Sequence, residues 1–138
     1  MVMFYQRIST TILLTLIVLN SSGQQLIQLP YSDDFENGNN GWTTLVTGDT
    51  STKWELGTPN FGLTNSTHSG SNCWDINLDS AYHNDSNSYL YSLFFNCNGL
   101  SSIVISFWMN YNTEAIWDGV ILFYKLNATN PVVLANWS

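Results

Sequence analysis

Acidic side chains recur beside tryptophans in a chain that otherwise carries little charge. The clusters are Asp33-Asp34-Phe35-Glu36 with Gly41-Trp42, then Trp54-Glu55, Cys73-Trp74-Asp75 and Trp117-Asp118-Gly119. Calcium takes about six to eight oxygen ligands from carboxylates, side-chain amides and backbone carbonyls. The chemistry that these residue types support most directly is the binding of a hard cation.

The first acidic cluster is the strongest position for such a cation. Side chains alternate along an extended strand, so Asp34 and Glu36 are expected on one face, with Phe35 turned toward the core. Two carboxylates on one edge repel each other unless a cation or hydrogen-bond donors lie between them. Asp118 could complete the shell when a later strand returns. The sequence predicts structural calcium at Asp34, Glu36 and Asp118, with a solvated acidic turn as the alternative.

Acid pairs also hydrolyse glycosides when about 5 to 9.5 Å separates the two carboxyl groups. Four acids are available for such a pair: Glu36, Glu55, Asp75 and Glu114. Their spacing does not indicate which two would meet. The sequence contains neither a Gly-x-Ser-x-Gly elbow nor a His-Glu-x-x-His motif, and His68 and His83 lie in polar stretches where solvated loop positions are expected. We therefore predict that the chain is not an enzyme.

Six tryptophans exceed what the core of a small domain requires. Exposed aromatic rings stack on sugars or anchor protein interfaces. In the apolar run 103–109, Trp108 falls on the face opposite Phe107, and Tyr111 and Trp117 could border it. We predict a ligand-binding surface made of Trp108, Tyr111 and Trp117. The alternative is that both faces of this strand are covered and the rings belong to the core.

Residues 1–23 have the pattern of a secretory signal peptide. Arg7 precedes the apolar run 12–19, and the small residues Ser21-Ser22-Gly23 follow it. The run is shorter than the roughly 20 apolar residues that span a bilayer. Export to the cell exterior or surface is expected, without membrane insertion after the leader is removed. A buried N-terminal helix or a membrane anchor is the alternative.

The remaining residues 24–138 are strongly acidic. Two lysines against ten acidic residues give a formal charge of −8. Nucleic-acid binding depends on Lys and Arg neutralising phosphates, so nucleic acid and anionic membrane surfaces are excluded as partners. Calcium, a glycan or an extracellular protein remain compatible with this charge.

Short extended runs separated by turn residues fill this part of the chain. The expected strands are 29–36, 42–46, 53–56, 89–95, 103–109, 117–124 and a last one from Val132, with a polar loop at 60–72 and a turn at Asn98-Gly99. No helical periodicity occurs after the leader. Many short strands predict one all-β module, a jelly-roll-like antiparallel β-sandwich. Because the chain stops inside an expected strand, we predict a module truncated at the C-terminus, with a naturally short protein as the alternative.

Two cysteines, Cys73 and Cys97, are present. In an exported chain such a pair predicts one disulfide, worth roughly 3 kcal/mol in the chain-entropy model. The alternative is two buried free thiols, each behaving as a small hydrophobe.

Several short motifs resemble the jelly-roll modules of the MAM-like and cleaved-adhesin (choice-of-anchor) type. They are Asp34-Phe35-Glu36 with Gly41-Trp42, Trp54-Glu55-Leu56-Gly57, the runs 89–95 and 105–108, and Trp117-Asp118-Gly119. The resemblance covers roughly residues 31–124. It departs from the family at Leu93, where those modules usually have Pro, and at 125–128, where they tend to continue Ser-x-Asp-Gly-Gly. It implies a jelly roll of secreted or surface-anchored proteins, with a structural calcium held partly by Glu36.

These features together predict a secreted, non-catalytic module for adhesion or for binding a carbohydrate or protein ligand. Two other functions fit the same features. One is an accessory domain of an exported peptidase or glycoside hydrolase, and the other is a structural spacer in a surface-anchored protein.

Overall fold

A computed structural model describes residues 25–126 and 130–137 of the 138-residue chain. The described part is an all-β structure with one 3₁₀ turn, which confirms the predicted fold class. The predicted signal peptide, residues 1–23, lies outside the described residues. Within the described part, no helix has the length and apolar character needed to cross a bilayer.

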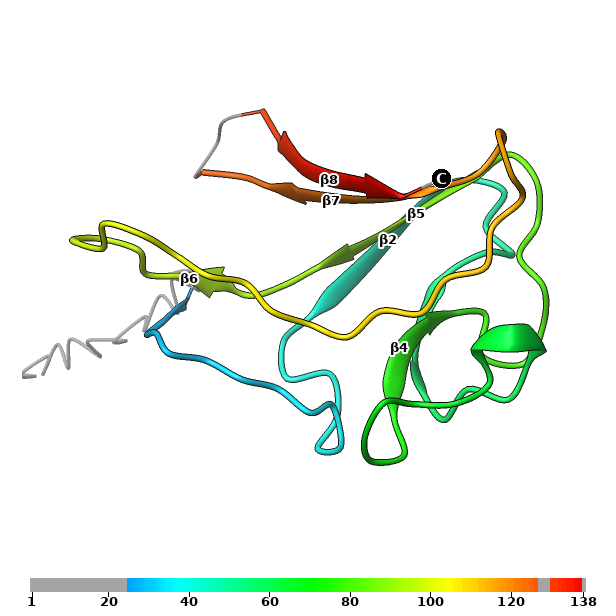
Figure 1. Cartoon of the computed structure of the whole chain (residues 1–138), viewed down its shortest axis with the longest axis horizontal. Helices are drawn as coiled ribbons and strands as arrows, with labels where there is room; N and C mark the ends of the chain where they lie inside the picture. The colour runs from blue at the N-terminus through cyan, green and yellow to red at the C-terminus, as the bar shows by residue number, and fades with distance from the viewer. Residues whose placement is uncertain (1–24, 127–129, 138) are drawn as a thin grey trace, which may run out of the picture.

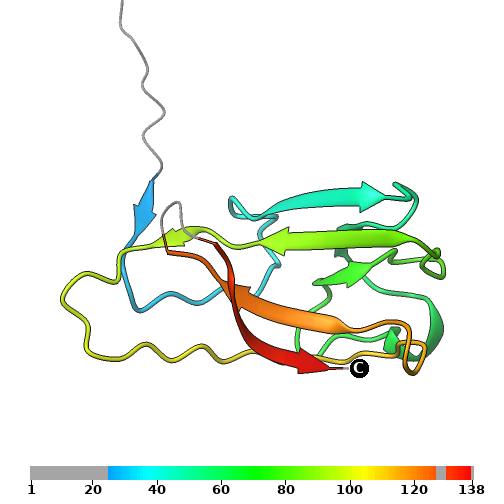
Figure 2. The ribbon, with the colours of Figure 1, turned by 90° about the horizontal axis from the view of Figure 1, so that it is seen from above.

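The strands form four two-stranded sheets, which Figures 1 and 2 show from two directions. The elements are β1 (Leu26–Ile27), β2 (Thr43–Gly48), β3 (Trp54–Gly57), η1 (Gly62–Thr64), β4 (Cys73–Ile76), β5 (Ser86–Tyr91), β6 (Phe94–Phe95), β7 (Val120–Tyr124) and β8 (Val132–Trp137). The pairs β2–β5, β3–β4 and β7–β8 are antiparallel, and β1–β6 is parallel.

The β2–β5 pair is the central ribbon. Thr43 lies opposite Tyr91 at one end, and Gly48 lies opposite Ser86 at the other. Gly48 has φ +82°, and a Cβ at this position would lie 2.0 Å from the carbonyl oxygen of Asp85. Only glycine allows the two backbones to approach this closely. Tyr91 makes an edge-on contact with Phe123, which connects this ribbon to the β7–β8 pair.

The β3–β4 pair packs against the same ribbon through polar contacts. The Trp54 indole N–H donates to the carbonyl oxygen of Ser88 at 3.3 Å, and the Ser88 hydroxyl donates to the carbonyl oxygen of Thr52 at 2.6 Å. Thr52 and Asn77 are the two polar or charged residues buried in the described structure, each 5% exposed. Among residues 25–126 and 130–137, Pro59 is buried as well, but no aliphatic or aromatic side chain of the larger hydrophobic residues is. Hydrogen bonds therefore have an unusually large share in holding this structure together.

Most of the predicted strands are present with shifted ends. The runs 42–46, 53–56, 117–124 and the one from Val132 correspond to β2, β3, β7 and β8, and the run 89–95 is divided between β5 and β6. β4 was not predicted, because Cys73–Ile76 follows a polar loop without an alternating pattern. The predicted sandwich is not established by four separate two-stranded sheets.

The predicted strand 29–36 is wrong. Its C-terminal half is a turn, because two aspartates bond to the backbone two residues ahead. Asp33 Oδ1 accepts from Phe35 N at 3.0 Å, and Asp34 Oδ1 accepts from Glu36 N at 3.1 Å. Phe35 has φ +63°, outside the extended region. Local Asx bonding therefore prevails over the apolar-polar alternation here.

The predicted strand 103–109 is not part of any sheet. Residues 101–114 follow a long irregular path between β6 and β7, shown in yellow and orange in Figure 1. Phe107 makes an edge-on contact with Trp137 of β8, with ring centroids 6.4 Å apart. The apolar alternation is present, but no strand among the described residues pairs with this segment through its backbone.

The predicted disulfide is also wrong. Cys73 and Cys97 are both half-buried free thiols. Cys73 belongs to β4, which pairs with β3, whereas Cys97 follows β6, which pairs with β1. Burial raises the pKa of the Cys73 thiol, and Asp75 raises it further. The sequence separation of the two cysteines carried no information about this placement in different sheets.

Replacing Asn77 by alanine should destabilise the fold by about 2 to 4 kcal/mol. Asn77 Oδ1 accepts from Lys53 N at 3.0 Å, and Asn77 Nδ2 donates to the Ala81 carbonyl at 3.1 Å. Its φ of +51° also favours asparagine over alanine. Urea denaturation would measure the loss. The exposed Asn112 provides the matched control, and equal effects of Asn77→Ala and Asn112→Ala would contradict this role.

Candidate functional site

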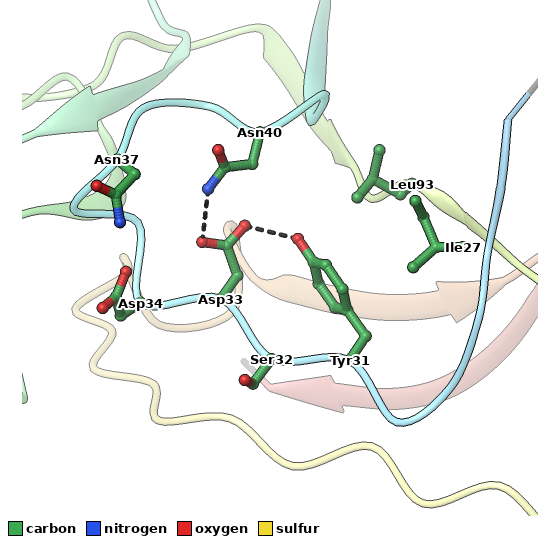
Figure 3. A pocket seen from close by; sticks show the side chains of 8 residues that line it. All are labelled: Ile27, Tyr31, Ser32, Asp33, Asp34, Asn37, Asn40 and Leu93. Atoms are coloured by element: carbon green, nitrogen blue, oxygen red, sulfur yellow. Dashed lines mark hydrogen bonds between the residues drawn. The ribbon is translucent and has the colours of Figure 1, made fainter.

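The first acidic cluster lines an open pocket of about 440 Å³ (Figure 3). Its walls are Ile27, Tyr31, Ser32, Asp33, Asp34, Asn37, Asn40 and Leu93. Figure 3 shows that the polar side chains come from the turn after β1, whereas Leu93 comes from the distant link between β5 and β6. Oxygen-bearing side chains are therefore gathered beside a small apolar wall.

Asp33 is the most heavily bonded carboxylate of this pocket. Its Oδ2 accepts from the Tyr31 hydroxyl at 2.7 Å, and its Oδ1 accepts from Asn40 Nδ2 at 2.9 Å as well as from Phe35 N. Burial alone would raise the pKa of Asp33, but these hydrogen bonds outweigh it and lower the pKa. The Trp42 indole N–H lowers it further, although no acceptor meets that N–H with full hydrogen-bond geometry. Asp33 thus serves to fix the turn.

Glu36 connects this turn to the polar loop 60–72. Glu36 Oε1 accepts from Ser71 N at 2.8 Å and from Asn72 N at 2.7 Å. Gly70 has φ +66°, and a Cβ at this position would meet the same oxygen, so a larger residue would require the Glu36 side chain to shift. The repulsion expected between Asp34 and Glu36 required either a cation or hydrogen-bond donors. In the structure, backbone N–H groups donate to both carboxylates.

The three predicted calcium ligands have separate local partners. Asp34 accepts from the Glu36 N–H, and Glu36 accepts from N–H groups of the loop 60–72. Asp118 Oδ2 accepts from the Tyr82 hydroxyl at 2.9 Å. In the described part of the chain, no group of three or more His, Cys, Asp or Glu side chains is arranged to hold a metal ion. The structure therefore does not bring these three carboxylates together around one position, and calcium binding stays a prediction.

Of the three residues predicted to form an aromatic surface, Trp108 is positioned by a ring contact with another loop. Trp108 stacks on His68 with ring centroids 3.8 Å apart and planes 9° from parallel, while 77% of the residue remains exposed. Asn110 Nδ2 donates to the Leu63 carbonyl at 3.4 Å. The loop 60–72 therefore contacts both Trp108 and Asn110, which are two residues apart in the irregular segment 101–114. Tyr111 and Trp117 are exposed as well, but no ring contact joins either to Trp108 among the described residues. The alternative that Trp108 is a core residue is wrong.

The acids considered for glycoside hydrolysis include one pair that faces across a ribbon. Glu55 of β3 lies opposite Asp75 of β4. Lys53 forms an ion pair with Glu55 at 2.9 Å and lowers its pKa, whereas burial raises the pKa of Asp75. The Glu55 carboxylate accepts from Leu78 N, and the Asp75 carboxylate accepts from Ile76 N. Each carboxylate has a structural partner of its own, and neither lines the pocket of Figure 3.

Two residues of these sites were missed by the sequence. Asp33 was passed over in favour of Asp34, although its place two residues before a turn-forming Phe35-Glu36 was a readable Asx signal. His68 was interpreted as a solvated loop residue. It is exposed, but its stacking on Trp108 depends on how the loop returns, and no local pattern predicts that return.

Replacing Glu36 by alanine should release the loop 60–72. The Ser71 and Asn72 amides would lose their acceptor, at a cost of about 1 kcal/mol for such exposed bonds. Amide hydrogen exchange at these two residues is the direct measurement and should accelerate. Glu36→Gln is the matched control, because its side-chain oxygen can still accept. Unchanged protection of both amides in Glu36→Ala would contradict the role of Glu36 in holding this loop in place.

Calcium should raise the thermal midpoint if the predicted site exists. A ligand that binds only the folded state stabilises it by about 2.7 kcal/mol at a hundred times its Kd. Melting in calcium and in chelator measures this, and Glu36→Gln should weaken the response. Magnesium at equal concentration controls for ionic strength. An equal midpoint in calcium, in chelator and in magnesium would contradict the predicted calcium site.

Comparisons with family models, with curated proteins and with solved structures found no match for this chain. The likeness to MAM-like and cleaved-adhesin modules therefore rests only on its short motifs.

Proposed function

We propose that this chain is a non-catalytic binding module that holds a neutral glycan against the exposed face of Trp108. The observation that carries the proposal is the His68–Trp108 stack. A ring held flat on one face by a neighbour loses little further freedom when a ligand covers its other face. Such pre-ordering favours binding by lowering its entropic cost.

The surroundings of Trp108 suit a polar ligand without charge. Ser106 and Asn110 lie two residues on either side of it, so they are expected on the same side of the extended segment. The contacts support this alternation, because Trp108 and Asn110 both reach the loop 60–72 while Phe107 reaches Trp137. No charged residue occurs between Asp85 and Glu114. An aromatic plane flanked by a hydroxyl and an amide fits a sugar ring better than an ion.

Export, surface location and a complete jelly-roll sandwich belong to the same proposal. They are supported by the leader-like residues 1–23 and by the motifs shared with MAM-like modules. The acidity of the rest of the chain favours neutral ligands over anionic ones. Tyr111 and Trp117 would then be secondary contacts for a longer oligosaccharide.

Replacing Trp108 by alanine should weaken glycan binding tenfold or more, as expected for an aromatic anchor at the centre of a site. An array of neutral oligosaccharides would first identify a ligand, and calorimetry would then compare the variants. His68→Ala should produce a smaller loss, because the indole keeps its exposed face but not its support.

Ile116→Ala is the matched control, since Ile116 is 94% exposed and apolar but has no ring. It should bind like the wild type. Absence of any binding on the array, or equal binding by wild type and Trp108→Ala, would refute the proposal.

A further inference from the structure

The segment 101–113 is the largest unpartnered feature of the described chain. Its backbone belongs to no sheet, and no backbone–backbone hydrogen bond between described residues involves it. Among the described residues, its side chains make ring contacts through Phe107 and Trp108 and a hydrogen bond through the Asn110 amide. Extended backbone with free N–H and C=O groups is a template for pairing with another strand.

The apolar surface of this segment is large. Val104 is 88% exposed, Ile105 58% and Trp108 77%, and Ile103, Phe107 and Met109 are exposed as well. If a large apolar side chain presents about 200 Å², these fractions amount to on the order of 600 Å². The largest apolar patch of a typical monomer is about 300 to 600 Å², so this surface lies at the upper end of that range.

The segment also lacks the features that keep strand edges apart. Natural edges are protected by lysine, proline or inward-pointing charges. Between Ser86 and Thr113 the sequence has no charged residue and no proline. Nothing in this stretch opposes the approach of an identical stretch.

We propose that segment 101–113 pairs antiparallel with the same segment of a second copy, around a two-fold axis at Ser106. This register places Ile105 opposite Phe107 of the other copy, Val104 opposite Trp108, and Ile103 opposite Met109. Every apolar side chain of residues 103–109 then lies beside an apolar side chain of the other copy on the same face. Ser106 lies opposite Ser106 of the other copy. A two-fold interface of this kind is self-complementary and closed.

Pairing through the backbone edge leaves the faces of the ribbon open. The outer face of Trp108 is perpendicular to that edge, so dimer formation and glycan binding are independent events. Each copy carries an acidic surface, so repulsion between copies opposes the pairing at low ionic strength. Association should therefore strengthen as salt is added, whereas a partner of opposite charge would be released by salt.

Sedimentation of the purified chain over a range of concentrations and of sodium chloride tests the pairing. We expect a reversible monomer–dimer equilibrium that shifts toward dimer with salt. Val104→Lys should weaken the dimer at least tenfold by placing a charge in the paired segment. Ile116→Lys is the matched control, because it adds the same charge at a more exposed position outside the segment, and it should dimerise like the wild type.

A cysteine at the axis tests the register. In a Cys73→Ala, Cys97→Ala background, Ser106→Cys should oxidise rapidly to a covalent dimer, because residues paired at a two-fold axis have Cα atoms about 4.5 to 5.5 Å apart. Ser101→Cys, which the register places far from its own copy, should cross-link slowly. A monomer at all concentrations and salts, equal effects of the two lysine variants, or equal cross-linking of the two cysteine variants would overturn the proposal.

Discussion

The double hydrogen bond from Ser71 and Asn72 to the Glu36 carboxylate is the contact on which the recognisable sites depend. It joins the acidic turn to a polar loop that contains only a single 3₁₀ turn and no strand. The same loop carries His68, which supports Trp108. The geometry of the proposed glycan surface therefore depends indirectly on a carboxylate that binds the same loop three and four residues after His68. Glu36 was expected to bind a cation, and in the structure the same negative charge attracts backbone N–H groups.

Polar contacts have this prominence because apolar burial is incomplete. In a usual small domain, buried apolar side chains supply the dominant favourable term of folding. In the described residues, the buried side chains are those of Thr52, Asn77 and one proline, Pro59. The rings of Trp42 and Trp74 bury indole nitrogens that have no hydrogen-bond partner. Each such nitrogen costs free energy. The β-ribbons are therefore joined at a few specific points, such as Trp54 with Ser88 and Tyr91 with Phe123.

The sequence was informative where structure is determined locally or by alternation. Short extended runs bounded by turn residues placed β2, β3, β7 and β8 within a few residues, and the period of two placed β5. It also placed Trp108 opposite Phe107, and these rings do make contacts with different elements. It failed at Asp33–Glu36, where side chains bond to their own backbone, and at 103–109, where a strand pattern has no neighbour. Partners distant in the chain, such as His68 for Trp108 or Ser71 for Glu36, cannot be derived from spacing, because the path of the loop decides them.

The nesting of the two central ribbons has a consequence for how this chain acquires its structure. β3 and β4 lie between β2 and β5 in the sequence, so the β3–β4 ribbon is enclosed by the longer connection that β2 and β5 must close. The entropy lost on closing a loop grows with its length, by about 0.6 kcal/mol for each doubling. Formation of β3–β4 shortens the effective loop from Gly48 to Ser86 and lowers the cost of the outer pairing. The topology thus favours assembly from the inside outward, and the hydrogen bond from Ser88 to Thr52 joins the outer ribbon to the chain just before β3.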